Sequence, residues 1–550
     1  MATTTQLPPP TRPGQRENTL DDSGSTRRHI VGAAGIMMAL IFASRVLGLV
    51  RDRVIAHKFG QGNLTDIYNA AFTIPDLLFF LIAGGALSAA FIPVFTEHIT
   101  TDREKEAWRI FSVVAAVMTI VVSAFILLGE IFTPTLVIWT NPGYSPEKVA
   151  ATVPLTRILL PAQLCFFLGG LMMGTLNARG RFVAPGLGPV IYNLAIIFGG
   201  LFLTQRFGVA GLCWGALFGA ILGNLLLQWV VVRRTGGYFL PEALRKHWRH
   251  PGVMKVWKLM LPVILGLALP QVSTIINKMF ASELGDGPQS ALMNANRLMQ
   301  VPLGIFAQAT AIAIFPTLSA QAARREIGAL RHTANFGIRS ILFLTIPSSL
   351  LMVVLALPIV QLILHGGRFG PQEAQMAANA LIFYAVGIFA WSAHSIISRG
   401  FYALQDSRTP VIVGTAVTVI FIPLNWLLMR WMSYEGLALA TSIAATIHML
   451  TMLILLRARL RGIEGGRLLA SLARIVAASL VTALACRVVR DLIQHRLSLH
   501  AGMSVTAQAF VTLSVCLLVS VVVYGALAVV LQMDEWQMLR SRLLRGRARG

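Results

Sequence analysis

Long apolar stretches, each close to the length of a membrane-spanning helix, recur along almost the whole chain. A transmembrane helix needs about 20 mostly apolar residues, because the hydrocarbon core of a bilayer is about 30 Å thick. The polar stretches between the apolar ones are short, so the pattern predicts an all-α polytopic membrane protein. The pattern predicts about fourteen spans, at residues 31–56, 65–96, 108–139, 150–178, 184–204, 209–232, 256–282, 290–319, 333–364, 374–404, 409–431, 435–456, 468–492 and 502–532.

The composition supports this prediction. Hydrophobic residues make up 55% of the 550 residues and charged residues only 13%, and the mean hydropathy is +0.69. Soluble domains carry about 25% charged residues. The net charge of +23 does not indicate nucleic-acid binding, because Lys and Arg lie in short clusters between apolar stretches. The four cysteines lie inside apolar stretches and form no CxxC pair, as expected of small hydrophobic residues in helices.

The distribution of Lys and Arg predicts the topology. With the N-terminus inside, the inner segments hold more than three times as many Lys and Arg as the outer connections, and residues 233–258 alone hold seven. By the positive-inside rule, both termini are predicted to be cytoplasmic, in a multi-pass inner-membrane protein. Residues 1–30 are predicted to be a disordered cytoplasmic tail and residues 533–550 a basic cytoplasmic tail.

The chain also repeats itself at an offset of 225 to 227 residues. The paired positions are Ser44 with Pro270, Pro75 with Pro302, Pro185 with Pro410, and Gly211 with Gly436. The repeat predicts two six-helix lobes, residues 31–235 and 256–461, joined by a cytoplasmic linker at 236–255 and followed by two additional helices in 468–532. Six is an even number, so the lobes insert in the same orientation, and such folds place the substrate path between the repeats.

Charged residues within apolar stretches are the strongest functional signal, because an ionisable group at membrane depth is costly unless it faces a cavity or a partner. Arg45 lies about 20 Å into the first span, at 1.5 Å per residue. Asp52 shares its helix face, and Arg51 lies beside Asp52 on another face. Arg297 lies in a polar stretch of the eighth span, in the other repeat.

Two interpretations of these arginines are open. They are predicted to converge on one central cavity, where guanidinium groups bind phosphate oxygens in a bidentate fork. Alternatively, Arg51 reaches the outer headgroups, and Arg297 belongs to a hydrogen-bonded cluster that holds the helices together. Asp76 in the second span is a candidate partner for an arginine, and Asn425 with Thr441 are candidates for a cation site.

No catalytic motif is present in the sequence. GxxxxGK[ST], HExxH and GxSxG are all absent. We therefore expect a secondary transporter that is not an enzyme, has no cofactor or metal site, and is coupled to the membrane potential or to a monovalent cation.

Several motifs resemble the MurJ/MviN family of lipid II flippases. They are SRVLGLVRDRVIAHKFG at 44–60, TDIYNAAFTIPDLL at 65–78, GALSAAFIPVF at 85–95, NRLMQVPLGIFAQATAIAIFPTLS at 296–319 and GFYALQDSRTPV at 400–411. The resemblance implies the multidrug/oligosaccharidyl-lipid/polysaccharide exporter fold, with a V-shaped cavity between two lobes. It implies alternating access, dependent on membrane potential, for an undecaprenyl-diphosphate-linked peptidoglycan precursor, an anionic lipid-linked glycan. Membrane lipids and cell-wall synthesis proteins are the expected partners.

The resemblance also implies roles for single residues. Arginines required for function in the family correspond to Arg45, Arg51 and Arg297, with Asp52 beside them as substrate-binding residues. In the second span, Phe79, Phe80 and Gly84 stand where many members carry charges at the lateral portal and inner gate. With Asp76, they form a candidate gate, and the alternative is that they are lipid-facing or packing residues.

Other functions remain open at this point. A relative that carries another polyprenyl-linked glycan, or an exporter of the same superfamily, fits the same pattern, although a basic cavity does not suit cationic drugs. A membrane-embedded glycosyltransferase needs a carboxylate or metal site facing a large outer loop, and the outer connections here are short. A scaffold that gathers wall-synthesis enzymes is the last alternative.

Overall fold

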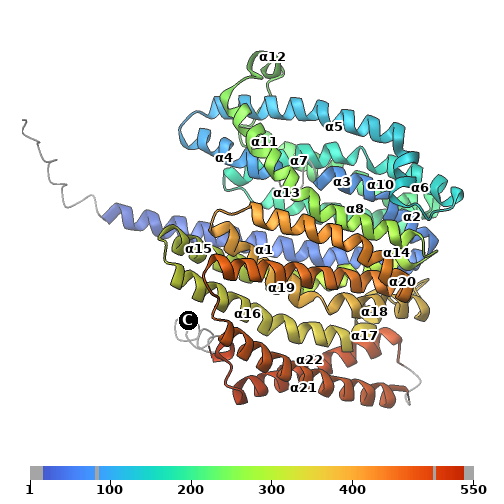
Figure 1. Cartoon of the computed structure of the whole chain (residues 1–550). Coiled ribbons are helices and arrows are strands. Elements are labelled where there is room, and N and C mark those ends of the chain that lie inside the picture. Colours follow the sequence, from blue (N-terminus) through green and yellow to red (C-terminus); the bar gives the residue numbers. More distant parts are fainter. Residues whose placement is uncertain (1–16, 81–85, 499–502, 538–550) are drawn as a thin grey trace, which may run out of the picture.

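The computed structural model describes residues 17–80, 86–498 and 503–537 (Figure 1). Gly84 lies outside the described residues. The first half of the chain forms α1 (Glu17–Phe59), α2 (Asn63–Ala71), α3 (Thr73–Leu78), α4 (Ala86–Thr100), α5 (Glu104–Thr140), α6 (Pro146–Leu159), α7 (Ala162–Ala178), α8 (Val183–Phe198), α9 (Thr204–Phe207), α10 (Ala210–Gly219), α11 (Leu227–Arg234) and α12 (Ala243–His247).

The second half of the chain is also helical. It forms α13 (Pro251–Ser282), α14 (Pro288–Pro302), α15 (Gln308–Ala323), α16 (Ile327–Val354), α17 (Ala356–Leu364), α18 (Pro371–Ala385), α19 (Ile388–Ala403), α20 (Arg408–Arg459), α21 (Gly465–Ser498) and α22 (Val505–Val530). Three π-helical turns, η2 (Gly199–Leu203), η3 (Ala220–Leu226) and η4 (Leu303–Ala307), connect successive helices. The part of the chain that the structure describes contains no strand.

These helices form the predicted all-α membrane architecture. Among the described residues, eight helices are long and apolar enough to cross a membrane, and up to ten if each of two bent pairs is one span. The remaining predicted spans correspond to α1, to the broken segment α2–α4, to α13 and to the second helix within α20. The fold is consistent with the predicted count of about fourteen.

The internal repeat is visible in the backbone. Ser433 has φ +55° and ψ −138° and divides α20 into two helices. Gly208, which is 225 positions earlier, has the same angles and separates α9 from α10. Three residues after each turn, Gly211 and Gly436 lie against the backbone of the preceding helix with no room for a Cβ. Both repeats therefore make the same tight turn with the same close approach.

Proline gives a second shared feature. Pro302 ends α14 and is followed by η4, and Pro75 in α3 is followed by π-helical backbone at Phe79 and Phe80. Proline lacks the N–H that would bond to the carbonyl of the preceding turn, so the regular ladder is interrupted there. Irregular helix of this kind within a membrane protein is tolerated where it is covered by protein or lines a cavity.

The helices pack into two groups. In the first, α1 packs on α8, and α4 packs on α7. In the second, α19 packs on α20, α14 on α18, and α16 on α21 and α19, with α22 beside α21. Helix α13 contacts α4 and α5 of the first group and α20 of the second. Apart from α13, the main contacts between the groups join α2 to α14 and α1 to α17.

The beginning of α1, the end of α22 and α12 lie at one end of the helices (Figure 1). We call this the α12 end, and the opposite end, where α2, α6 and α14 meet, the α6 end. At the α12 end, Arg339 of α16 forms ion pairs with Asp534 and Glu535, which follow α22. An even number of crossings is therefore consistent with the structure.

Two segments differ from the predicted boundaries. Helix α1 begins at Glu17, so part of the stretch predicted to be disordered, residues 1–30, is helical. Extending an existing helix costs little compared with nucleating one, so a polar stretch that precedes a long span continues as helix. The predicted linker contains α12, and α13 begins at Pro251, a few residues before the predicted start of its span.

Candidate functional site

The carboxylate of Asp52 binds two arginines, one from each half of the chain. Its Oδ1 accepts hydrogen bonds from Nε and Nη2 of Arg51, at 3.1 and 2.9 Å, and from Nη1 of Arg297 at 2.8 Å. Asp52 is 8% exposed, whereas the Arg297 side chain is 33% exposed. Two guanidinium groups share one carboxylate, so the cluster keeps one net positive charge. The structure thus brings together three of the predicted site residues.

Asn193 of α8 holds the orientation of Arg51. Its Oδ1 accepts from Nη1 of Arg51 at 3.1 Å, and its Nδ2 donates to the carbonyl oxygens of Ser44 and Pro189 at 3.2 and 3.0 Å. These bonds tie α1 to α8 and fix the guanidinium plane. The sequence analysis did not single out Asn193, although a lone amide within the apolar stretch 184–204 was a usable signal.

Arg45 lies elsewhere on α1 and contacts the other half. A Cβ placed on Gly304, in η4, would collide with the guanidinium of Arg45. The absence of a side chain at Gly304 therefore makes room for this cation. Arg45 is exposed, and no carboxylate among the described residues lies within ion-pair distance of it. Arg45 therefore lies at the boundary between the halves, and it has no counter-ion in the described part of the chain.

Asp76 and Lys278 lie near this cluster. Asp76 of α3 is exposed and lies within electrostatic reach of Lys278, Arg297 and Arg51. Lys278 of α13 is buried, and its Nζ donates to the carbonyl oxygen of Asn69 at 3.3 Å and to the hydroxyl of Thr73 at 2.9 Å. A lysine from the second half thus binds helices of the first half.

The candidate gate residues Phe79 and Phe80 belong to an aromatic row. The rings of Phe79 and Phe80 pack edge to face with centroids 5.5 Å apart, and Phe79 packs on Phe166 of α7 at 5.4 Å. Phe166 in turn contacts Tyr192 of α8 at 5.3 Å. These contacts place Phe79 among helices of its own half. The role of Phe79 and Phe80 as a gate stays a prediction.

Asp66 of α2 binds the beginning of α14 at the α6 end. It is fully buried, and its two oxygens accept from the backbone N–H of Gly287 at 2.7 Å and of Ser290 at 2.9 Å. The hydroxyl of Ser290 adds a third bond at 2.5 Å. Lys148 bridges Asp66, at 3.3 Å, and Asp286, at 2.7 Å. A carboxylate from one half thus caps a helix of the other half, where the helix dipole favours negative charge.

Polar contacts beside Asp66 extend this junction. Gln289 accepts from the hydroxyl of Tyr144 and donates to Oδ1 of Asn141 at 3.0 Å. The backbone N–H of Gly143 donates to the hydroxyl of Ser282 at 3.1 Å, and a Cβ on Gly143 would collide with the backbone of α13. The sequence analysis missed this junction, because no spacing rule links a loop residue to a helix start more than 130 positions away.

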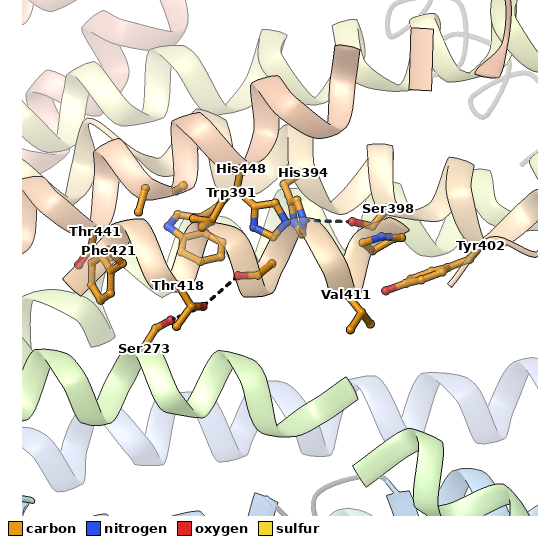
Figure 2. A pocket seen from close by; sticks show the side chains of 15 residues that line it. Ser273, Trp391, His394, Ser398, Tyr402, Val411, Thr418, Phe421, Thr441 and His448 are labelled. Atoms are coloured by element: carbon orange, nitrogen blue, oxygen red, sulfur yellow. Dashed lines mark hydrogen bonds between the residues drawn. The ribbon is translucent and has the colours of Figure 1, made fainter. Parts of the chain in front are cut away.

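A cavity of about 210 Å³ lies between α13, α19 and α20 (Figure 2). The rings of His394 and His448 meet in it with centroids 4.2 Å apart, and Ser398 contacts His394 at 3.2 Å. Trp391 and Thr441 also line the cavity, and no Asp, Glu, Lys or Arg does. The lining thus combines imidazole, indole and hydroxyl groups.

The candidate cation-site residues are both in α20. Thr441 accepts from Nδ2 of Asn277 at 3.1 Å. Asn425 is fully buried, and neither atom of its amide has a hydrogen-bond partner among the described residues; Oδ1 of Asn277 also lacks one. Within the described ranges, no three His, Cys, Asp or Glu residues gather as a metal site would require.

Comparisons with known proteins agree with this fold. The family profile described as lipid II flippase MurJ matches residues 55–507. The probable lipid II flippase MurJ of Vibrio cholerae serotype O1 is 30% identical over 425 residues, which cover 75% of this chain and 80% of that protein. The corresponding protein of Bdellovibrio bacteriovorus is 29% identical over 536 residues, covering 94% and 97%.

Solved structures give the same result. A lipid II flippase MurJ in an inward closed conformation aligns with a TM-score of 0.74 at 25% identity, over 90% of this chain and 98% of that one. A multidrug transporter of the MATE family, in an inward-facing conformation, aligns with a TM-score of 0.66 at 13% identity, over 78% and 98%, which shows a shared fold alone. The profile match, the relatives and the fold together place this chain in the MurJ family of lipid II flippases.

Proposed function

We propose that this protein moves lipid II, the undecaprenyl-diphosphate-linked peptidoglycan precursor, from the inner to the outer leaflet of the cytoplasmic membrane for cell-wall synthesis. The observation that carries the proposal is the ion-paired cluster in which Asp52 joins Arg51 of one half to Arg297 of the other. A cationic site shared by two lobes suits a transporter whose lobes rock around an anionic substrate. The protein acts as a transporter, without a catalytic step.

The cluster supplies groups that suit a diphosphate. Arginine stays charged at every physiological pH and presents a planar fork of donors to phosphate oxygens. Arg297 is the more exposed arginine of the cluster, and Arg45 has no carboxylate partner among the described residues. In our mechanism, the diphosphate takes the place of Asp52 on Arg297 and also binds Arg45, while Arg51 keeps its bond to Asp52.

The junction at the α6 end keeps the outer side closed in this mechanism. Asp66, Lys148 and Lys278 bind across the halves there. We place the α12 end in the cytoplasm, because the Lys and Arg of the sequence concentrate in the segments at that end. The substrate headgroup enters from the cytoplasmic side, and outward opening requires the bonds of Asp66 to α14 to break. Phe79 and Phe80 then offer an apolar surface for the polyprenyl tail.

We further propose that a monovalent cation or the membrane potential drives the cycle. Asn425, Asn277 and Thr441 offer amide and hydroxyl oxygens, which are ligands that hard cations prefer. The side-chain oxygens of Asn425 and Asn277 support this proposal, because neither has a hydrogen-bond partner among the described residues and buried polar atoms normally have one. Replacing Asn425 by Leu should remove the ion dependence of transport. Unchanged ion dependence in a well-inserted N425L variant would reject the site.

Complementation tests the function. A cell depleted of its own lipid II flippase should grow when it expresses this protein, and lipid II should become accessible at its outer surface. The matched negative control is R297A, and R430A, which removes a cation that stacks on Trp426 instead, is the positive control. If the cells fail to grow although the wild-type protein reaches normal levels in the membrane, the second candidate is favoured. That candidate is a flippase for another polyprenyl-linked glycan. The uncharged Phe79 and Phe80 of the gate segment agree with a different substrate.

A further inference from the structure

Basic side chains from two segments that are distant in the sequence line a recess at the α6 end. Lys58 lies in the last turn of α1, Arg368 lies in the hairpin between α17 and α18, and Arg206 lies in α9. The recess has a volume of about 540 Å³, and its lining includes Lys58, Thr204, Gln205 and Arg368. Arg206 follows Gln205 directly, but its guanidinium lies over the ring of Phe207 and is not part of the lining.

This gathering is unexpected from the sequence alone. Connections at the α6 end hold few Lys and Arg, as the positive-inside rule requires of an outer surface. Two of these scarce cations nevertheless line one recess. Neither Lys58 nor Arg368 has a carboxylate within ion-pair distance among the described residues. Their positive charges are therefore not used to hold the protein's own acidic groups.

The recess exists only where the two halves meet. The carbonyl oxygen of His57 accepts from the backbone N–H of Arg368 at 3.0 Å, and Nη1 of Arg53 donates to the carbonyl oxygen of Leu362 at 2.7 Å. A Cβ on Gly367 would collide with the carbonyl oxygen of His57. The hairpin thus packs directly on the end of α1, and separation of the halves here would pull Arg368 away from Lys58.

We propose that this recess binds the phosphate group of an anionic lipid, with Lys58 and Arg368 on its oxygens and with the side-chain amide of Gln205 as a hydrogen-bond donor. The proposal rests on the orientation given above, which places the recess at the level of the outer headgroups. Two lipids carry this chemistry there: a phospholipid of the outer leaflet and the lipid diphosphate that is being released. In either case, a phosphate held by both halves stabilises the arrangement with a closed outer side, since a ligand favours the state that it binds better.

Binding of lipids to the purified full-length protein tests the site. Native mass spectrometry should detect phosphatidylglycerol on the wild type, bound about ten-fold more tightly than on the double variant K58A/R368A, because charge-assisted contacts are lost. R430A is the matched control, since it removes one cation at the same end, and it should bind phosphatidylglycerol like the wild type. Inorganic diphosphate should compete with the lipid for the wild type only.

The result identifies the source of the phosphate. Loss of phosphatidylglycerol binding in K58A/R368A assigns the site to the outer leaflet, and selective loss of undecaprenyl diphosphate binding assigns it to the released substrate. Equal binding of both lipids by the wild type and the double variant overturns the proposal. These binding measurements do not depend on transport. The lipid site can therefore be rejected while the proposed function holds, and the proposed function can be rejected while the lipid site holds.

A distance measurement tests the conformational part. Asn63 and Gln372 are exposed residues from the two halves at this end, so spin labels there report whether the halves are apart. Phosphatidylglycerol should increase the short-distance population in the wild type and leave it unchanged in K58A/R368A. An equal increase in both proteins would show that the lipid acts without the recess and would overturn this part.

Discussion

Asp66 caps the first turn of α14 through Ser290, with bonds to both the backbone N–H and the hydroxyl of that residue. The two residues come from different halves of the chain, so the bonds must break if the halves separate at the α6 end. Replacement of Asp66 by Asn keeps the shape and removes the charge. We expect D66N to reduce the ratio of closed to open protein about ten-fold, because charge-assisted bonds are roughly twice as strong as neutral ones.

Spin labels at Asn63 and Gln372 give the readout for D66N. The matched control is D102N, because Asp102 is exposed at the α12 end and has a positive φ of 55°, which Asn tolerates well. D102N should leave the distances unchanged. Identical distance distributions for D66N and the wild type would show that this cap does not hold the halves together.

The second prediction concerns the arginines. Replacing Arg45, Arg51 or Arg297 by Ala should abolish flipping while membrane insertion stays intact. Arg→Lys should recover only part of the activity, since a point charge does not reproduce the guanidinium fork. Outer-surface exposure of lipid II, normalised to the amount of protein in the membrane, is the measurement. Full activity of any Ala variant would remove that arginine from the proposed site.

The third prediction tests the space at Gly304. G304A should displace the guanidinium of Arg45 and lower flipping by about ten-fold, although it adds one methyl group. G170A is the control, because a Cβ on Gly170 meets no atom within 4 Å. G170A should transport like the wild type. If G304A also transports like the wild type, the position of Arg45 against η4 is not needed for transport.

The fourth prediction uses the equivalent turns of the two repeats. Ser433 adopts a backbone conformation with φ +55°, which costs a non-glycine residue about 1–3 kcal/mol. S433G should therefore raise the unfolding temperature, and G208A should lower it. A Cβ on Gly208 would meet no atom within 4 Å, so the loss at that position would report backbone strain alone. Thermal unfolding of the purified variants, followed by tryptophan fluorescence, measures both shifts. A lower unfolding temperature for S433G would contradict the assignment of strain.

The sequence predicts the helices and the repeat well, because span length, charge bias and a constant offset are all local or periodic signals. It also selects Arg51, Asp52 and Arg297, since charge within an apolar stretch is rare enough to stand out. It does not predict that Asp52 serves both arginines, which depends on how two helices 245 positions apart approach each other.

The missed residues share a different property. Asn193 could have been noticed as the lone amide of its apolar stretch, whereas Asp66 and Lys148 are ordinary residue types for the first turn of a helix. Their importance comes from partners in distant segments, such as Ser290 for Asp66. A single sequence carries no signal for such pairs. The extension of α1 to Glu17 was missed for a local reason, since hydropathy detects the apolar part of a helix and not its polar continuation.

The shared carboxylate of Asp52 bears on how tightly the cycle is coupled to cargo. If the empty protein opened outward, Arg297 would leave Asp52 and its guanidinium would lose this carboxylate partner. With a diphosphate on Arg297, the same movement leaves no bare cation, because Arg51 neutralises Asp52 on its own side. We therefore expect empty turnover to be slower than loaded turnover. In that case the shared carboxylate limits slippage, in which the protein cycles without delivery of a precursor.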